Sequence, residues 1–214
     1  MRFLVVSDLH QKKSAIPGII EAFEANGCDA LLMLGDITDF GTAADACEII
    51  HEIGKKTYAI PGNCDPLDLP ELIGNCCESV HGRAFEIGRL RFAALGGSNP
   101  TIFNTPFEYP EEEIEARLRP ISSEGMVLMV HAPAHGHMDR ITSGANVGST
   151  AIAKIVEEFK PLAVLSGHIH EARGFKEDDG TFFLNPGAAR DGYAAVLDLS
   201  GKPEAKMLVL KGAR

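Results

Sequence analysis

Residues 2–10 read R-F-L-V-V-S-D-L-H, a short apolar run followed at once by an aspartate and a histidine. An apolar run of this length without polar alternation is typical of a β-strand that is buried on both faces. The pattern returns at residues 30–36, A-L-L-M-L-G-D. We therefore expect strands at 2–7 and 30–34, each followed by polar side chains at its carboxyl end.

Helical segments separate these apolar runs. Ser14 is predicted to cap a helix that stops at Gly27, while Thr42 and Asp45 open a second helix. A third strand is expected at residues 56–60. The resulting βαβαβ order predicts a parallel sheet with right-handed crossovers.

The second half of the chain indicates strands of both directions. A hairpin is expected across residues 83–97, with its turn near Gly88. The remaining elements are predicted helices at 110–119 and 149–159 and predicted strands at 126–130, 162–166, 181–184, 193–199 and 205–210, the last three on antiparallel patterning. We therefore predict an α/β fold of mixed sheets flanked by helices, in one domain over residues 1–214.

The composition excludes several classes of function. Of 214 residues, 45% are hydrophobic and 23% are charged, which is typical of a globular protein. The formal net charge of −10 gives no overall attraction for a polyanion, so duplex nucleic acid is not expected as a partner. No apolar run approaches the ~20 residues that span a bilayer. We expect a cytoplasmic protein without membrane contact.

The cysteines argue against a redox or zinc site. Five are present, at 28, 47, 64, 76 and 77, without any C-x-x-C pair. We expect most of them to be buried thiols in a reducing compartment.

Polar side chains that can bind a metal follow five of the predicted strands. Open α/β sheets bind ligands at the carboxyl ends of their strands. Taken alone, Gly35-Asp36 and Gly62-Asn63 are also typical of simple turns, because glycine and asparagine are favoured where φ is positive. The strongest single signal is G-H-I-H at 167–170, because two histidines at i and i+2 beside a glycine are unusual without a metal. The candidate ligands are Asp8, His10, Asp36, Asn63, His131, His168 and His170.

Five sequence blocks, in order, resemble the calcineurin-like metallophosphoesterases and among them the small prokaryotic phosphodiesterases. The blocks are D-L-H at 8–10, G-D-I-T-D at 35–39, G-N-C-D at 62–65, V-H-A-P at 130–133 and G-H-I-H at 167–170. The resemblance implies two mixed β-sheets packed as a sandwich and flanked by α-helices. It also implies a dinuclear metal centre that hydrolyses phosphate esters.

The resemblance gives each candidate ligand a role. Asp8, His10 and His170 would hold one ion, and Asn63, His131 and His168 would hold the other. Asp36 would bridge both ions. Asp36, Asn63 and His131 are also the residues predicted to act in catalysis.

Two divalent ions ~3.5–4 Å apart can clamp a phosphate and lower the pKa of a bridging water. The mixture of carboxylate, amide and imidazole donors favours manganese, with Fe, Co, Ni or Zn as alternatives. We therefore expect a phosphodiesterase for small phosphodiesters. The alternatives are a phosphomonoesterase or nucleotidase, and a non-catalytic binding module that keeps its metals.

Cys64 stands where many members of the family carry a histidine that protonates the leaving group. A thiol titrates near pH ~8.5 rather than ~6.5 and is a poor substitute. The alternatives for Cys64 are a thiolate nucleophile and a metal ligand. We expect a thiol that fills the place of a missing acid, so the best substrates are diesters with good leaving groups.

Four further residues are candidates around the centre. Asp39 and Asp65 either orient the ligands or are exposed turn aspartates. His135 and His137 either line the substrate pocket, partly replacing the missing acid, or are solvated loop residues.

Overall fold

The first sheet brings four parallel strands from the amino-terminal half together with the two last strands. In the computed structural model, which describes residues 1–212, its order is β12-β11-β1-β2-β3-β4. The bounds are β1 (Arg2–Val6), β2 (Ala30–Met33), β3 (Thr57–Ala59), β4 (Glu78–Ser79), β11 (Tyr193–Asp198) and β12 (Glu204–Val209). β1 to β4 run parallel, whereas β11 pairs antiparallel with both β1 and β12.

The second sheet is also mixed, with the order β5-β6-β7-β8-β10-β9. Its strands are β5 (Arg83–Ile87), β6 (Leu90–Leu95), β7 (Val127–Val130), β8 (Ala163–Leu165), β9 (Gly174–Asp178) and β10 (Thr181–Asn185). The hairpin predicted near Gly88 is confirmed as the antiparallel pair β5 and β6. Two mixed sheets flanked by helices confirm the predicted fold class.

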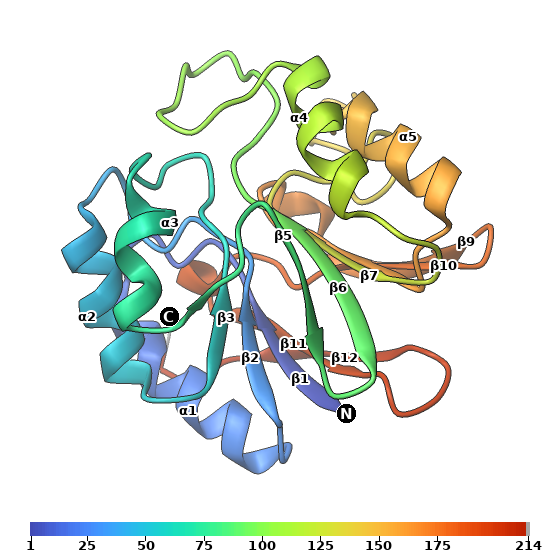
Figure 1. Cartoon of the computed structure of the whole chain (residues 1–214). Helices are drawn as coiled ribbons and strands as arrows, with labels where there is room; N and C mark the ends of the chain where they lie inside the picture. The colour runs from blue at the N-terminus through green and yellow to red at the C-terminus, as the bar shows by residue number, and fades with distance from the viewer. Residues whose placement is uncertain (213–214) are drawn as a thin grey trace.

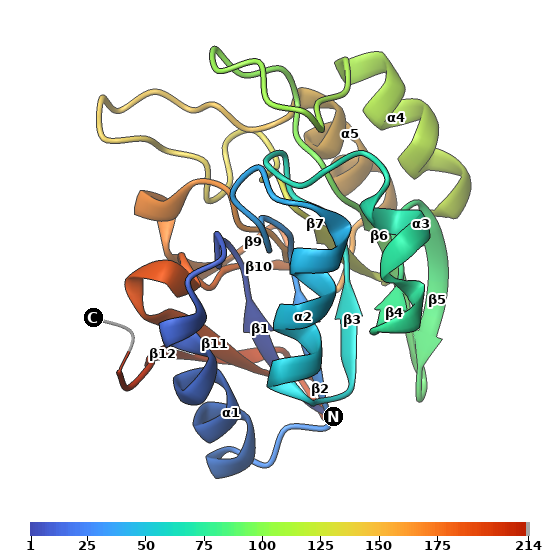
Figure 2. The same cartoon turned by 90° about the vertical axis from the view of Figure 1, so that its left-hand side faces the viewer.

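Five α-helices within residues 1–212 cover the outer faces of the two sheets (Figure 1). They are α1 (Ile16–Ala25), α2 (Ala43–Ile53), α3 (Leu69–Leu72), α4 (Glu111–Leu118) and α5 (Thr150–Phe159). Figure 2 shows α1 and α2 in front of β1, β2 and β3. In Figure 1, α4 and α5 lie on the face of the second sheet that is turned away from the first sheet. The order of layers is therefore helix, sheet, sheet, helix.

The alternation of side chains along β1 explains these layers. Leu4 and Val6 point to the core beneath α1 and α2, whereas Phe3 and Val5 point to the core between the two sheets. Successive residues of a strand face opposite sides, so a strand covered on both faces is apolar at every position. A third core packs α4 and α5 onto the second sheet, with Ile155 fully buried in it.

Several local predictions were wrong. Ser14 caps no helix, because residues 13–15 form a 3₁₀ turn and α1 begins after Ala15 without a side-chain cap. The strand near 181–184 is not simply antiparallel, since β10 pairs parallel with β8 and antiparallel with β9. The short elements α3, β4 and β9 were not predicted. Thr42 and Asp45 do form a reciprocal capping box at α2, as predicted.

The cysteine prediction was wrong for two residues. Cys47 on α2 and Cys76 form a disulfide with Cα atoms 5.5 Å apart, while Cys28, Cys64 and Cys77 are free. The pair is 29 residues apart in sequence, and the packing of α2 against the segment after α3 brings it together. Within residues 1–212, no helix has the length and apolarity to cross a bilayer.

Candidate metal centre

The candidate ligands follow strands of both sheets and meet where the carboxyl ends of these strands lie together. β1, β2 and β3 lead into Asp8, Asp36 and Asn63, whereas β7 and β8 lead into His131 and His168. Backbone hydrogen bonds fix the loops to each other, with Asp8 N donating to Gly35 O at 3.0 Å and Gly167 N to His131 O at 2.9 Å. The candidate ligands thus lie where the two sheets meet, and both sheets contribute to them.

Two glycines allow the loops after β2 and β3 to approach closely. A Cβ added at Gly62 would lie 2.1 Å from Asp36 Oδ1, and one added at Gly35 would lie 2.4 Å from Gly62 N. Gly35 has a positive φ of 101°. Gly62 does not have a positive φ, and a side chain is excluded there by space alone.

Four candidate ligands adopt the left-handed backbone conformation that side chains disfavour. The φ values are 56° for Asp8, 46° for His10, 50° for Asp36 and 64° for His168. Each such residue costs free energy and persists only where its surroundings hold it, which is a property that clusters at functional sites. No sequence pattern indicates this strain, because none of these residues is a glycine.

One group of ligand atoms comprises Asp8, His10 and His170, all within 4.8 Å of one another. Asp8 Oδ1 lies 3.2 Å from His170 Nε2, and Asp8 Oδ2 accepts the backbone N–H of His168 at 3.1 Å. Burial raises the pKa of Asp8, but the contact with His170 outweighs it and lowers the pKa. Asp8 is therefore an anion.

A second group comprises Asp8, Asp36 and His131. His131 Nε2 lies 2.9 Å from Asn63 Oδ1, which brings the predicted amide ligand to this side. The ring of His168 stands edge-on to that of His131 with centroids 5.1 Å apart, although His168 belongs to none of the three compact groups found in residues 1–212. Burial lowers the pKa of His168 to about 3, which favours a neutral imidazole.

Asp36 of the second group lies between His10 of the first group and His131. Its Oδ2 is 3.5 Å from His10 Nε2 and 3.6 Å from His131 Nε2, and its Oδ1 accepts the backbone N–H of Cys64 at 2.8 Å. Burial raises the pKa of Asp36, because an isolated carboxylate is poorly solvated in this interior. A buried carboxylate in this position needs a neighbouring cation to remain charged.

The unpartnered ring nitrogens of His10 indicate that this set of side chains fits metal ions. Both ring nitrogens of His10 are buried without a hydrogen-bond partner among residues 1–212, and burial lowers the pKa of His10 to about 4. His131 Nδ1 donates to Leu34 O at 2.8 Å, so in the neutral ring the lone pair of Nε2 faces the amide oxygen of Asn63. Two acceptors held against each other are stabilised by a cation that both can bind.

The two predicted aspartates outside the seven lie in different surroundings. Asp39 is exposed, with Oδ1 3.6 Å from His10 Nδ1. Asp65 is fully buried and accepts hydrogen bonds from the backbone of Ile37, Thr38 and Gly62, so it ties the loop after β2 to the loop after β3. Asp65 orients the loops rather than lying exposed in a turn.

Cys64 lies inside the cluster. Its sulfur is within 4.8 Å of ligand atoms of His10 and Asp36, and it accepts a hydrogen bond from Asn63 Nδ2 at 3.5 Å. Burial, followed by the negative charge of Asp36, raises the pKa of the Cys64 thiol. In the protein without bound ions this favours the protonated thiol over a thiolate nucleophile.

His135 and His137 are not brought to the cluster. They line a cavity of about 560 Å³ together with residues of α5 and β10, and none of the seven candidate ligands lines it. The ring of His137 stacks on Phe183 with centroids 4.1 Å apart. We therefore leave both histidines out of the proposed site.

Two residues near the centre were missed in the sequence. Thr105 Oγ1 accepts a hydrogen bond from Asn63 Nδ2 at 3.1 Å, and Arg190 Nη2 lies 3.5 Å from His170 Nδ1. Thr105 lies in the loop before α4 and Arg190 in the 3₁₀ turn before β11, both outside the sequence blocks. No local pattern marks either residue.

Comparison with known proteins supports the resemblance to the calcineurin-like phosphoesterases. The profile of the calcineurin-like phosphoesterase superfamily domain matches residues 1–202. The uncharacterised protein MJ1162 of Methanocaldococcus jannaschii is 32% identical over 195 residues, which cover 87% of this chain and 88% of that protein. Phosphodiesterase YfcE of Escherichia coli K12 is 30% identical over 74 residues, or 30% of this chain and 40% of YfcE. The crystal structure of TT1561 from Thermus thermophilus superposes with a TM-score of 0.75 at 18% identity, covering 100% of this chain and 99% of TT1561.

Proposed function

This chain belongs to the calcineurin-like phosphoesterase superfamily, and we propose that it hydrolyses small phosphodiesters with two divalent metal ions bound at the junction of its sheets. We further propose that residues 1–214 form a single domain for this activity. The membership supports a hydrolase of phosphate esters. The preference for diesters over monoesters is a separate proposal, which rests on Cys64 and on the partial match to YfcE.

The position of Asp36 carries the proposal. Its Oδ2 lies within 3.6 Å of imidazole nitrogens on both sides, from His10 and from His131. A single carboxylate between two sets of donors is the arrangement that a bridging ligand requires. We propose that Asp8, His10 and His170 bind one ion and that Asn63, His131 and His168 bind the other.

The bound ions would supply charge neutralisation at the phosphate and activation of a water molecule. The chain's own residues do the positioning. The hydrogen bond from His131 Nδ1 to Leu34 O leaves the lone pair of Nε2 available to a metal ion. The backbone N–H of Cys64 donates to Asp36 Oδ1 and fixes the orientation of that carboxylate. Oxygen and imidazole nitrogen donors without a proposed thiolate ligand suit manganese.

The protonated thiol of Cys64 supports a preference for good leaving groups. A buried thiol of raised pKa is a weak acid and protonates an alkoxide poorly, so esters that need little protonation react best. The partial match to YfcE, whose name states phosphodiesterase activity, also supports diesters. Aryl or strained cyclic phosphodiesters are the proposed substrates.

The test is turnover of a matched pair of esters, an aryl phosphate monoester and an aryl phosphodiester with the same leaving group. Protein stripped of metal and verified as metal-free should be inactive, and reloading with Mn should restore diester hydrolysis with about two ions bound per chain. Activity that survives verified stripping refutes the metal-dependent mechanism. Faster hydrolysis of the monoester would indicate a phosphomonoesterase, and two bound ions without any turnover would indicate a binding module.

A further inference from the structure

The segment 98–109 lies beside the turn that carries Asn63. Phe107 N donates to Asn63 O at 3.1 Å, and Ser98 and Tyr109 join the two ends of the segment through a hydrogen bond of 2.9 Å. The tip of the segment projects outward, with Ile102 90% exposed and Phe103 77% exposed. The segment is therefore fixed at its base and exposed at its tip.

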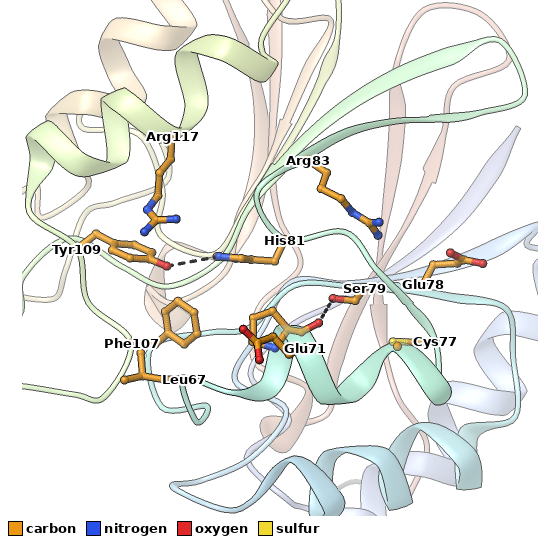
Figure 3. A pocket seen from close by; sticks show the side chains of 12 residues that line it. Leu67, Glu71, Cys77, Glu78, Ser79, His81, Arg83, Phe107, Tyr109 and Arg117 are labelled. Carbon is orange, nitrogen blue, oxygen red and sulfur yellow. Dashed lines mark hydrogen bonds between the residues drawn. The ribbon is translucent and has the colours of Figure 1, made fainter.

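An aromatic cluster holds that base (Figure 3). Phe107 meets the ring of His81 edge-on at 5.3 Å, and Tyr109 stacks beside His81 with its hydroxyl 3.4 Å from His81 Nε2. Arg117 of α4 covers the Tyr109 ring at 4.6 Å. These contacts fix the position of the chain on either side of Glu108.

Glu108 organises the inside of the segment. Its carboxylate accepts the backbone N–H and the hydroxyl of Thr101 at 3.0 and 2.6 Å, and those of Thr105 at 2.8 and 2.5 Å. Burial raises the pKa of Glu108, but these hydrogen bonds outweigh it and lower the pKa below its ordinary value. Glu108 is thus an ionised group that only accepts hydrogen bonds.

That restriction determines the direction of the next hydrogen bond. The hydroxyl proton of Thr105 is committed to Glu108, so Thr105 Oγ1 can only accept from Asn63. The amide nitrogen of Asn63 must then face Thr105, which it does at 3.1 Å. The amide oxygen is turned to the opposite side, 2.9 Å from His131 Nε2.

We propose that Glu108 and Thr105 are positioning residues that lock the amide of Asn63 with its oxygen directed into the metal centre. The inference rests on the proposed function, because it takes Asn63 as a ligand. The oxygen and nitrogen ends of an amide have nearly the same shape but opposite polarity. With the amide reversed, Asn63 would present N–H groups to a cation and could not bind it.

Thr105→Val is the informative variant, because valine keeps the shape of threonine and removes the acceptor. Thr105→Ser keeps the hydroxyl and should restore wild-type behaviour. Thr101→Val is the matched control. The Thr101 hydroxyl also donates to Glu108, but it forms no hydrogen bond with Asn63. Binding of Mn is measured by calorimetric titration, and the spin coupling between the two ions by electron paramagnetic resonance.

We expect Thr105→Val to weaken the binding of one of the two ions by about 10- to 100-fold, the usual effect of losing a partner that orients a ligand. The signal of coupled ions should give way to that of a single ion at limiting Mn. Thr105→Ser and Thr101→Val should bind both ions as the wild type does. If Thr105→Val does not fold, Glu108→Gln tests the same contact. Glutamine can donate as well as accept hydrogen bonds, so it no longer fixes the direction of the Thr105 hydroxyl, and the binding of one ion should also become weaker.

Equal binding of both ions by wild type and Thr105→Val, or by Glu108→Gln where that variant is used, overturns the inference and leaves the proposed function intact. Equal losses in Thr105→Val and Thr101→Val also overturn it, because they would reflect the segment as a whole. A wild-type protein that binds no pair of ions refutes the proposed function together with this inference.

Discussion

Replacing Gly62 with alanine should disable the metal centre without removing a single ligand. An added Cβ at position 62 would lie 2.1 Å from Asp36 Oδ1 and 2.2 Å from Asp36 N. Side-chain carbons do not approach other heavy atoms within 3.0 Å, so the two loops must separate by about 0.9 Å. The strain falls on the carboxylate that lies between the two groups of donors.

The surrounding hydrogen bonds leave the loops little freedom to absorb this shift. Asp36 is held by Cys64 N at 2.8 Å, and Gly62 N is held by Asp65 Oδ2 at 2.8 Å. A displacement of ~1 Å in a catalytic group can cost ~10²-fold in rate. Overpacking of this kind also lowers the free energy of unfolding by ~1–3 kcal/mol. We expect Gly62→Ala to lose about 10²-fold in diester hydrolysis and to melt at a lower temperature.

The measurement compares Gly62→Ala with Gly201→Ala, both reloaded with Mn to saturation. A Cβ at Gly201 meets no atom of residues 1–212 within 4 Å, so this control should match the wild type in rate and stability. Rates on an aryl diester, Mn stoichiometry and thermal unfolding are recorded for each protein. Full activity and full Mn occupancy in Gly62→Ala would show that the spacing of the two loops does not set the position of Asp36.

Substitutions at three other positions test separate parts of the structure. Asp36→Asn should lower diester hydrolysis by ~10²-fold or more with the fold retained on circular dichroism, and a mild effect would mean that Asp36 is not the bridge. Cys64→Ala should change hydrolysis of an aryl diester little, whereas Cys64→His should raise rates on alkyl diesters by up to ~10²–10⁴-fold, measured over graded leaving groups at equal Mn occupancy; loss of aryl turnover in Cys64→Ala would assign the thiol to catalysis. Cys47→Ser opens a disulfide between residues 29 apart and should lower the free energy of unfolding by about 3–4 kcal/mol in urea titration, and an unchanged value would argue against the bond to Cys76.

The apolar runs of the sequence predicted the buried strands well, because a strand covered on both faces must be apolar throughout. Leu4 and Phe3 of β1 face different cores, and no polar residue fits either position. The same reasoning failed for α3, β4 and β9, which are short or lie at the edges of the sheets. Their formation depends on contacts with the rest of the fold rather than on local pattern.

The position of the candidate ligands at strand ends was predictable from the sequence, whereas the residues that support them were not. Asp65 looked like one more turn aspartate, yet it is fully buried between two loops. Thr105 meets Asn63 across 42 positions of sequence, and Cys47 meets Cys76 across 29. Contacts of this kind are set by the way that layers pack, which no window of sequence contains.

The centre combines features that each destabilise a folded chain. Asp8, Asp36 and His168 hold a disfavoured backbone conformation, and burial raises the pKa of both Asp36 and Asp65. Such costs persist only where the surrounding structure outweighs them. Backbone hydrogen bonds between the loops oppose the strain, but they leave both ring nitrogens of His10 without partners and the acceptors of His131 and Asn63 face to face. Positive ions at the proposed site would relieve both of these remaining costs at once, so the cost that the protein alone carries here favours the proposal that these residues bind metal ions.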